Sequence, residues 1–229
     1  MEKKDLKPAG VFKYFEEICQ VPRPSKKEEK MVAYLKEFGA KHNLETKVDE
    51  AGNVLIKKPA TPGKENLQTV ILQSHIDMVC EKNNDVQHNF LTDPIQTEIE
   101  GDWLKAKGTT LGADNGIGVA TELALLADDS IEHGPLECLF TIDEETGMTG
   151  AFALQEGFMS GDILLNLDSE DEGELYIGCS GWIFLLQSRS ERFERWSLGR
   201  RHSPRQRKCQ QNSEQIPHPH CRKARFVSV

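Results

Sequence analysis

Four short apolar segments constrain the fold of this chain more than any other feature. A stretch with apolar side chains at helical spacing lies between the second and the third of them. Residues 54–56, 69–72, 136–142 and 163–165 are rich in leucine and β-branched side chains, as expected of buried strands. Residues 117–127 place apolar side chains along one face of a helix. Strands that alternate with helices predict an α/β fold with a mostly parallel central sheet flanked by helices.

Two further helices are predicted near the N-terminus. Residues 8–19 carry apolar side chains at helical spacing, with Pro8 as an early helix residue. A second helix is predicted over residues 31–38. Ser25 with Glu28 three positions later is typical of a capping box at the start of this second helix.

Polar side chains suited to metal binding stand at the junctions of these elements. Three acidic or histidine-containing segments follow predicted strands, and one aspartate precedes the 117–127 helix. In a parallel sheet, ligand groups gather where the strands end, so we expect these side chains to lie close together. The candidate site residues are His75, Asp77, Asp114, Glu144, Glu145 and Asp168.

Each of these segments also has an ordinary structural interpretation. His75 fits a strand-end histidine bonded to its neighbours, Asp114 a helix N-cap, and Asp168 a hydrophilic loop. Glu144 and Glu145 fit solvated charges at a strand end. The coincidence of suitable donors at four separate junctions favours a metal site over four independent coincidences.

The donor types narrow the metal and its chemistry. Carboxylate and imidazole donors without thiolates suit zinc, manganese or cobalt. A shared aspartate suits two ions about 3.5 to 4 Å apart. Of the adjacent Glu144 and Glu145, one can bind metal while the other removes a proton from water.

The six cysteines are widely spaced without a C-x-x-C pair, so we interpret them as reduced thiols.

Four motifs in the first part of the chain resemble a known peptidase family. They are Ser74–Val79 (SHIDMV), Gly108–Gly116 (GTTLGADNG), Ile142–Gly147 (IDEETG) and Leu167–Glu170 (LDSE). Together they resemble the co-catalytic zinc aminopeptidase and carboxypeptidase clan, and within it the cytosolic aminoacyl-histidine (Xaa-His) dipeptidases. The resemblance covers residues 1 to about 182, and the Gly-Ala-Asp-Asn-Gly segment is its most specific part.

The resemblance implies a role for each matching residue. It implies two zinc ions, with cobalt or manganese as alternatives, of which one is bound by His75 and Asp168 and the other by Glu145. Asp114 bridges both ions, and Asp77 orients His75. Glu144 is the general base that activates water and then the acid that protonates the leaving amine. The implied reaction is hydrolysis of a small dipeptide of the Xaa-His type.

The sequence also departs from this family. Intact members take a further histidine ligand from far downstream and carry an inserted lid and dimerisation domain, and neither is recognisable here. We therefore interpret residues 1–182 as the N-terminal segment of a catalytic domain, truncated and of low activity. Alternatives are another clan member (a tripeptidase, aminopeptidase or amino-acid deacylase) or a non-catalytic metal-binding fragment. An intact relative is expected to be a homodimer.

Residues 183–229 differ in composition from the rest of the chain. They hold nine arginines and two lysines against three acids, whereas residues 1–182 hold one arginine, Arg23, and 34 of the 37 acids. We interpret 183–229 as a basic tail that is out of frame or disordered, with a genuine basic tail as the alternative.

The acidic charge of residues 1–182 argues against nucleic acid or an anionic membrane as a partner. No signal peptide or transmembrane run is evident, so a cytoplasmic location is expected.

Overall fold

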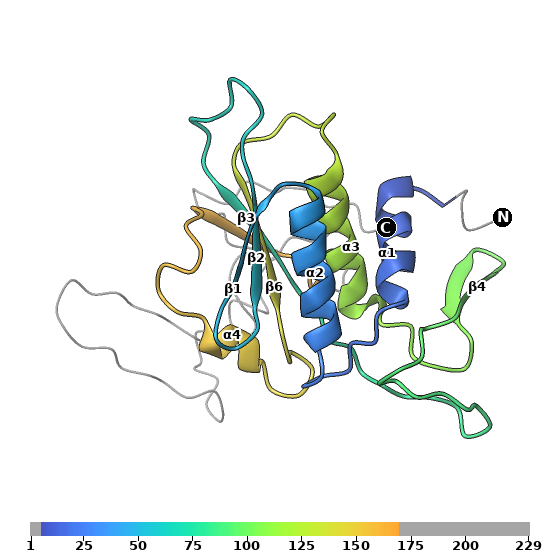
Figure 1. The fold of residues 1–229 in the computed structure, drawn as a ribbon. Helices are drawn as coiled ribbons and strands as arrows, with labels where there is room; N and C mark the ends of the chain where they lie inside the picture. Colours follow the sequence, from blue (N-terminus) through green and yellow to red (C-terminus); the bar gives the residue numbers. More distant parts are fainter. Residues whose placement is uncertain (1–5, 170–229) are drawn as a thin grey trace, which may run out of the picture. The chain divides into compact units, whose positions relative to one another are not determined.

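A computed structural model describes residues 6–169, and Figure 1 shows how their elements are arranged. The helices are α1 (Ala9–Cys19), α2 (Glu29–Lys41), α3 (Ala113–Ala127) and α4 (Thr149–Ala153). The strands are β1 (Glu45–Val48), β2 (Val54–Lys58), β3 (Val70–His75), β4 (Thr97–Glu100), β5 (Trp103–Ala106), β6 (Leu136–Thr141) and β7 (Ile163–Asn166). The interpretation of residues 183–229 as a basic tail lies outside the described residues.

Five strands form one mixed sheet in the order β1-β2-β6-β3-β7. The strands β6, β3 and β7 run parallel to one another, whereas β2 and β1 continue the sheet in antiparallel pairings. Helices α1, α2 and α3 lie together on one side of this sheet (Figure 1). The predicted α/β fold, with parallel strands and flanking helices, is confirmed. The antiparallel β1, and the separate β4-β5 hairpin, were not predicted.

The alternation of side chains along the strands divides the core between the two faces of the sheet. Leu72 and Phe140 face the helices and pack in one large cluster with apolar side chains of α1, α2 and α3. Leu55, Ile71 and Leu139 face the other way, where Leu154, Phe158 and Met159 pack against them. Each fully buried aliphatic or aromatic side chain contributes roughly 1.5 to 3 kcal/mol, so the helical face provides most of the stabilisation.

The start of α2 differs from the predicted capping box. The helix begins at Glu29, and Glu28 at its N-cap position makes no side-chain capping hydrogen bond. Ser25 instead donates its hydroxyl to Asp77 Oδ2 at 2.7 Å, and Glu28 Oε1 accepts the backbone N–H of Asp143 at 3.0 Å. The capping-box prediction is wrong because both side chains have partners far away in the sequence.

The register of the parallel strands brings their carboxyl ends to one edge of the sheet. His75, the last residue of β3, pairs with Thr141, the last residue of β6. On its other side β3 pairs with β7, with Gln73 opposite Asn166. The segments that follow these three strands therefore emerge next to one another. None of the helices in the described part of the chain has the length and apolar character needed to cross a membrane.

Candidate metal centre

Three of the predicted ligands come together at this edge of the sheet. His75 Nε2 lies 3.0 Å from Asp114 Oδ1 and 3.8 Å from Asp168 Oδ1. One ligand atom of each of the three residues lies within 4.8 Å of the others, a spacing at which all three can bind one cation. The His75 side chain is 1% exposed, whereas the Asp114 side chain is 64% exposed, so the group opens to solvent on its carboxylate side.

Asp77 lies behind His75 and connects it to the loop after β6. We call this the acidic loop because it carries Asp143, Glu144 and Glu145. Asp77 Oδ1 is 3.2 Å from His75 Nδ1, an ion-pair distance whose geometry falls short of a well-aligned hydrogen bond. The backbone N–H of Glu144 donates to the same Oδ1 at 3.0 Å, and that of Glu145 donates to Oδ2 at 3.2 Å. One buried carboxylate therefore fixes both the imidazole ring and the backbone of the two glutamates.

Glu144 and Glu145 follow β6 as predicted, and both are half-buried. Neither belongs to the three-residue group around His75 within the described part of the chain. Their neighbour Asp143 is buried, and its carboxylate accepts the hydroxyls of Thr146, at 2.5 Å, and Thr149. Asp143 therefore shapes the loop, while the two glutamates are left partly open to solvent.

The segment before the regular part of α3 carries Asp114 in a non-helical conformation. Gly112 has a φ of +68°, Asp114 and Asn115 both depart from helical φ and ψ, and the peptide bond between these two residues is cis. Asp114 directs a carboxylate oxygen to His75. Asn115 donates its amide to Asp168 Oδ1 at 2.6 Å and to the Leu167 carbonyl at 3.1 Å. This segment thus supplies one candidate ligand and holds another.

Asn115 and Arg23 were not among the predicted site residues. Asn115 stands in the GADNG motif directly after Asp114, and that adjacency is the signal that points to it. Arg23 is buried and donates to the carbonyls of Ile76, Asp77 and Gly112. Its signal is composition, since it is the one arginine among residues 1–182 and stands between Pro22 and Pro24.

Burial and neighbouring charges shift the pKa values of His75, Asp77 and Asp168 in opposite directions. Burial disfavours charged His75, but the adjacent carboxylate of Asp77 and the charge of Asp168 outweigh it and raise the His75 pKa to about 9. Burial also opposes ionisation of Asp77, yet the adjacent His75 ring and the hydrogen bonds from Ser25 and Glu144 lower its pKa to about 2. Burial raises the pKa of Asp168, an effect that the charge of His75 partly counters.

Burial likewise raises the pKa values of the two glutamates of the acidic loop. For both Glu144 and Glu145, burial is the largest cause, and the nearby charge of His75 partly counters it. The charges of Asp77 and Asp168 add to the upward shift. Carboxylates crowded around one imidazole repel one another, and a bound cation would relieve that repulsion.

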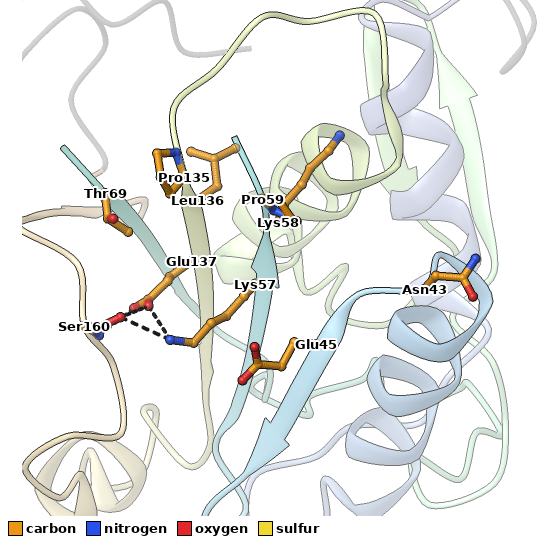
Figure 2. A pocket seen from close by; sticks show the side chains of 10 residues that line it. All are labelled: Asn43, Glu45, Lys57, Lys58, Pro59, Thr69, Pro135, Leu136, Glu137 and Ser160. Carbon is orange, nitrogen blue, oxygen red and sulfur yellow. Dashed lines mark hydrogen bonds and ion pairs between the residues drawn. The ribbon is translucent and has the colours of Figure 1, made fainter. Parts of the chain in front are cut away.

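A cavity of about 450 Å³ (Figure 2) lies at the other end of the parallel strands from His75, Asp114 and Asp168. Thr69, which precedes β3, and Leu136, which begins β6, both line it. Figure 2 shows the Lys57 ammonium next to both Glu137 and Ser160, at 2.6 Å from Glu137 Oε1 and 3.1 Å from Ser160 Oγ. Lys57 and Glu137 pair with each other inside this cavity, whereas Glu45 and Lys58 pair with Lys47 and Asp129 outside it. The donors suited to a metal lie at the other end of the strands.

Comparison with known proteins relates this part of the chain to a peptidase family. Residues 71–184 match the family model described as peptidase family M20/M25/M40. Residues 71–184 therefore carry the domain of peptidase family M20/M25/M40. The matched residues begin in β3 and contain the candidate ligands His75, Asp114, Glu145 and Asp168.

Three named peptidases resemble the chain over most of its length. The cytosol non-specific dipeptidase of Escherichia coli is 52% identical over 182 residues, which cover 80% of this chain. The crystal structure of an aminoacylhistidine dipeptidase from Vibrio alginolyticus is 56% identical, with a TM-score of 0.77 over 79% of this chain. A Staphylococcus aureus tripeptidase shares the fold at 23% identity, with a TM-score of 0.61 over 72% of this chain.

The chain is much shorter than these M20 relatives. It spans 38% of the length of the Escherichia coli dipeptidase and 37% of the Vibrio alginolyticus structure. It spans 44% of the Staphylococcus aureus tripeptidase. The residues described above therefore correspond to part of a longer family member.

Proposed function

We propose that this chain is the N-terminal part of a metal-dependent dipeptidase that hydrolyses small dipeptides of the Xaa-His type. The observation that carries the proposal is the group of His75, Asp114 and Asp168, with ligand atoms within 4.8 Å of one another. The names of the Escherichia coli and Vibrio alginolyticus relatives support a dipeptide as the substrate. The name of the former also supports a cytoplasmic location.

The residues present fit a divalent cation. His75 offers Nε2 toward two carboxylates, while its other ring nitrogen faces Asp77, an arrangement common for metal-bound histidines. One nitrogen and several oxygen donors suit zinc, and cobalt or manganese also accept this set. We propose that two zinc ions would bind here: His75 and Asp168 would hold one, Glu145 would hold the other, and Asp114 would contribute to both.

The proposed mechanism assigns the proton transfers to Glu144. A divalent cation in this site would polarise the peptide carbonyl and make water a better nucleophile. Glu144 takes a proton from the attacking water and returns it to the leaving amine, so that the peptide nitrogen departs as a neutral amine. Asp77 holds the Glu144 backbone N–H at 3.0 Å and thereby keeps this base next to His75.

A second candidate function follows from the length of the chain. Because it spans 38% of its Escherichia coli relative, parts of the substrate pocket and further metal ligands can lie in segments this chain does not contain. The alternative is a fragment that binds metal without turnover. Other activities within the family, such as tripeptidase or aminopeptidase activity, differ from the main proposal in substrate only.

The experiment compares metal content and hydrolysis in the full chain and one variant. Purified protein is loaded with zinc, freed of excess metal, and offered carnosine and other Xaa-His dipeptides. We expect hydrolysis by the original chain, and retention of zinc with loss of hydrolysis in Glu144→Gln. The exposed Glu156→Gln is the matched control and should keep both. Zinc retention without Glu144-dependent hydrolysis would support the metal-binding fragment, and absence of stoichiometric zinc would refute both candidates.

A further inference from the structure

One short segment, residues 23–28, contacts three loops that carry or adjoin most of the candidate site residues. Arg23 reaches the loop after β3 and the loop before α3. Ser25 reaches Asp77 in the first of these loops, and Glu28 reaches the acidic loop after β6. Pro24 also forms an isolated parallel bridge with Met78. The proposed reaction assigns no role to residues 23–28.

Arg23 makes the most extensive of these contacts. Its side chain is buried, with 2% of the residue exposed, and its Nη1 donates to the carbonyls of Ile76 and Asp77, both at 3.0 Å. Its Nη2 donates to the Gly112 carbonyl at 2.5 Å. The planar guanidinium presents several donors in a fixed fork, so one side chain ties two loops together in a defined geometry. A lysine at this position has one nitrogen and cannot reproduce that fork.

The glycines of the GADNG motif leave room for this guanidinium. A Cβ added at Gly112 would lie 2.6 Å from Arg23 Nη2, and one added at Gly116 would lie 2.7 Å from the same atom. Both distances are shorter than any ordinary contact with a Cβ. The two glycines therefore have a packing reason to be glycine, beyond the positive φ of Gly112.

Ser25 and Glu28 extend the same connection to the acidic loop. The Ser25 hydroxyl and the Glu145 backbone N–H both donate to Asp77 Oδ2, so the 23–28 segment and the acidic loop meet at one oxygen. Glu28 Oε1 accepts the backbone N–H of Lys26 at 2.9 Å and that of Asp143 at 3.0 Å. These bonds fix the 23–28 segment and the start of the acidic loop against each other.

We propose that residues 23–28 position the metal centre by holding these three loops in register, with Arg23 as the principal positioning residue. Its consequence for metal binding rests on the proposed function above. Arg23 contacts backbone carbonyls and none of the candidate ligand atoms, so it acts through the loops. Replacing it should displace His75, Asp114 and Glu144 together, whereas a residue that only stabilises the core would leave their relative placement unchanged.

The first test uses the metal-free full chain and needs no assumption about activity. Hydrogen–deuterium exchange is followed in peptides covering residues 74–79, 110–116 and 142–148. We expect Arg23→Lys to speed exchange in all three segments, and Ser25→Ala to speed it in the first and third. The matched control is Lys58→Met, because Lys58 is another buried cation whose Nζ donates to backbone carbonyls, those of Leu125 and Asp128.

The control makes the result decisive. Lys58→Met should speed exchange near the end of α3 and leave the three loops as they are. Loop exchange in Arg23→Lys no faster than in Lys58→Met would overturn the proposal. If circular dichroism shows that Arg23→Lys does not fold, Ser25→Ala carries the same comparison, and unchanged exchange around Asp77 in that variant would equally overturn it.

The second test measures the metal centre itself through the visible absorption of bound Co²⁺. Arg23→Lys should weaken Co²⁺ binding about 10- to 100-fold, the range seen when partners of metal ligands are removed. Lys58→Met should bind as the original chain does, and an equal affinity in Arg23→Lys would contradict the positioning role. Failure of the original chain to bind Co²⁺ would count against the proposed function, while the exchange comparison would still decide the inference on residues 23–28.

Discussion

Asp77 Oδ1 lies 3.2 Å from His75 Nδ1 and also accepts the Glu144 backbone N–H at 3.0 Å. The residue proposed to bind metal and the residue proposed to move the proton therefore share one buried carboxylate. Any change at Asp77 acts on both, so effects of Asp77 and His75 substitutions on metal affinity should be non-additive.

We predict that Asp77→Asn weakens binding of Zn²⁺ or Co²⁺ by about 10- to 100-fold. The amide keeps the size of the side chain but removes the negative charge that faces His75, so the ring is a poorer donor. Competition with a chelator of known affinity measures the change. Asp93→Asn removes an exposed carboxylate that accepts a hydrogen bond from Asn89 and should bind metal normally. Equal affinities in the two variants would remove Asp77 from the site.

We predict that Asn115→Ala lowers metal affinity by about tenfold. The Asn115 amide holds Asp168 Oδ1 at 2.6 Å and the Leu167 carbonyl at 3.1 Å, so its loss frees the segment after β7. The same chelator competition applies. Asn89→Ala, which removes an exposed side chain that accepts the Leu91 backbone N–H, is the control. An unchanged affinity in Asn115→Ala would mean that Asp168 needs no support from α3.

Gly116→Ala should lower the free energy of unfolding by about 1 to 3 kcal/mol, as is typical of overpacked positions. The added Cβ would meet Arg23 Nη2 at 2.7 Å and Phe15 Cε2 at 3.1 Å. Gly147→Ala is the control, because its Cβ would have no neighbour within 4 Å. Urea denaturation measures both variants, and the prediction fails if Gly116→Ala is as stable as Gly147→Ala.

Glu122 provides a prediction about pH. It is fully buried in α3, its Oε1 accepts the Ser74 hydroxyl at 2.7 Å, and burial raises its pKa well above the ordinary value of 4.5. The folded chain therefore keeps a proton that the unfolded chain releases, so this group lowers stability progressively as the pH rises above about 4.5.

Replacing Glu122 by glutamine removes that pH-dependent loss. The difference in unfolding free energy between Glu122→Gln and the original chain should grow in favour of the variant from pH 4.5 to pH 7. Urea denaturation at several pH values measures it. Glu156→Gln, at an exposed position, should follow the original chain throughout. A constant difference across the pH range would show that Glu122 titrates normally in the fold.

The sequence predicted the elements with strong apolar periodicity and missed those without it. Helices α1 and α3 and strands β3 and β6 carry continuous or periodic apolar side chains, and each was predicted near its observed position. The strand β1 (Glu45–Val48) is short and mostly exposed, so it has no apolar signal and owes its place to pairing with β2. Its antiparallel direction depends on that pairing and could not be read from the residues.

The proximity of His75, Asp114 and Asp168 was predictable from the sequence, but the hydrogen bonds that hold their loops were not. The placement of His75 and Asp168 after strands was enough to predict that they meet, because parallel strands end at one edge. Ser25 was assigned to a helix cap because Ser-x-x-Glu fits that local pattern. Its true partner is Asp77, 52 residues away, and such tertiary hydrogen bonds leave no local trace. The same holds for Arg23 and Gly112.

The long sequence separations within the site have a consequence for synthesis on the ribosome. Arg23 and Gly112 are 89 residues apart, Asp77 and Glu144 are 67, and Asn115 and Leu167 are 52. A growing chain adds about 5 to 20 residues per second, so His75 and Asp114 are made seconds before Asp168 emerges. During that interval the nascent polypeptide exposes an incomplete set of ligands. Metal delivery before Asp168 emerges would thus meet two of the three donors of this group, His75 and Asp114.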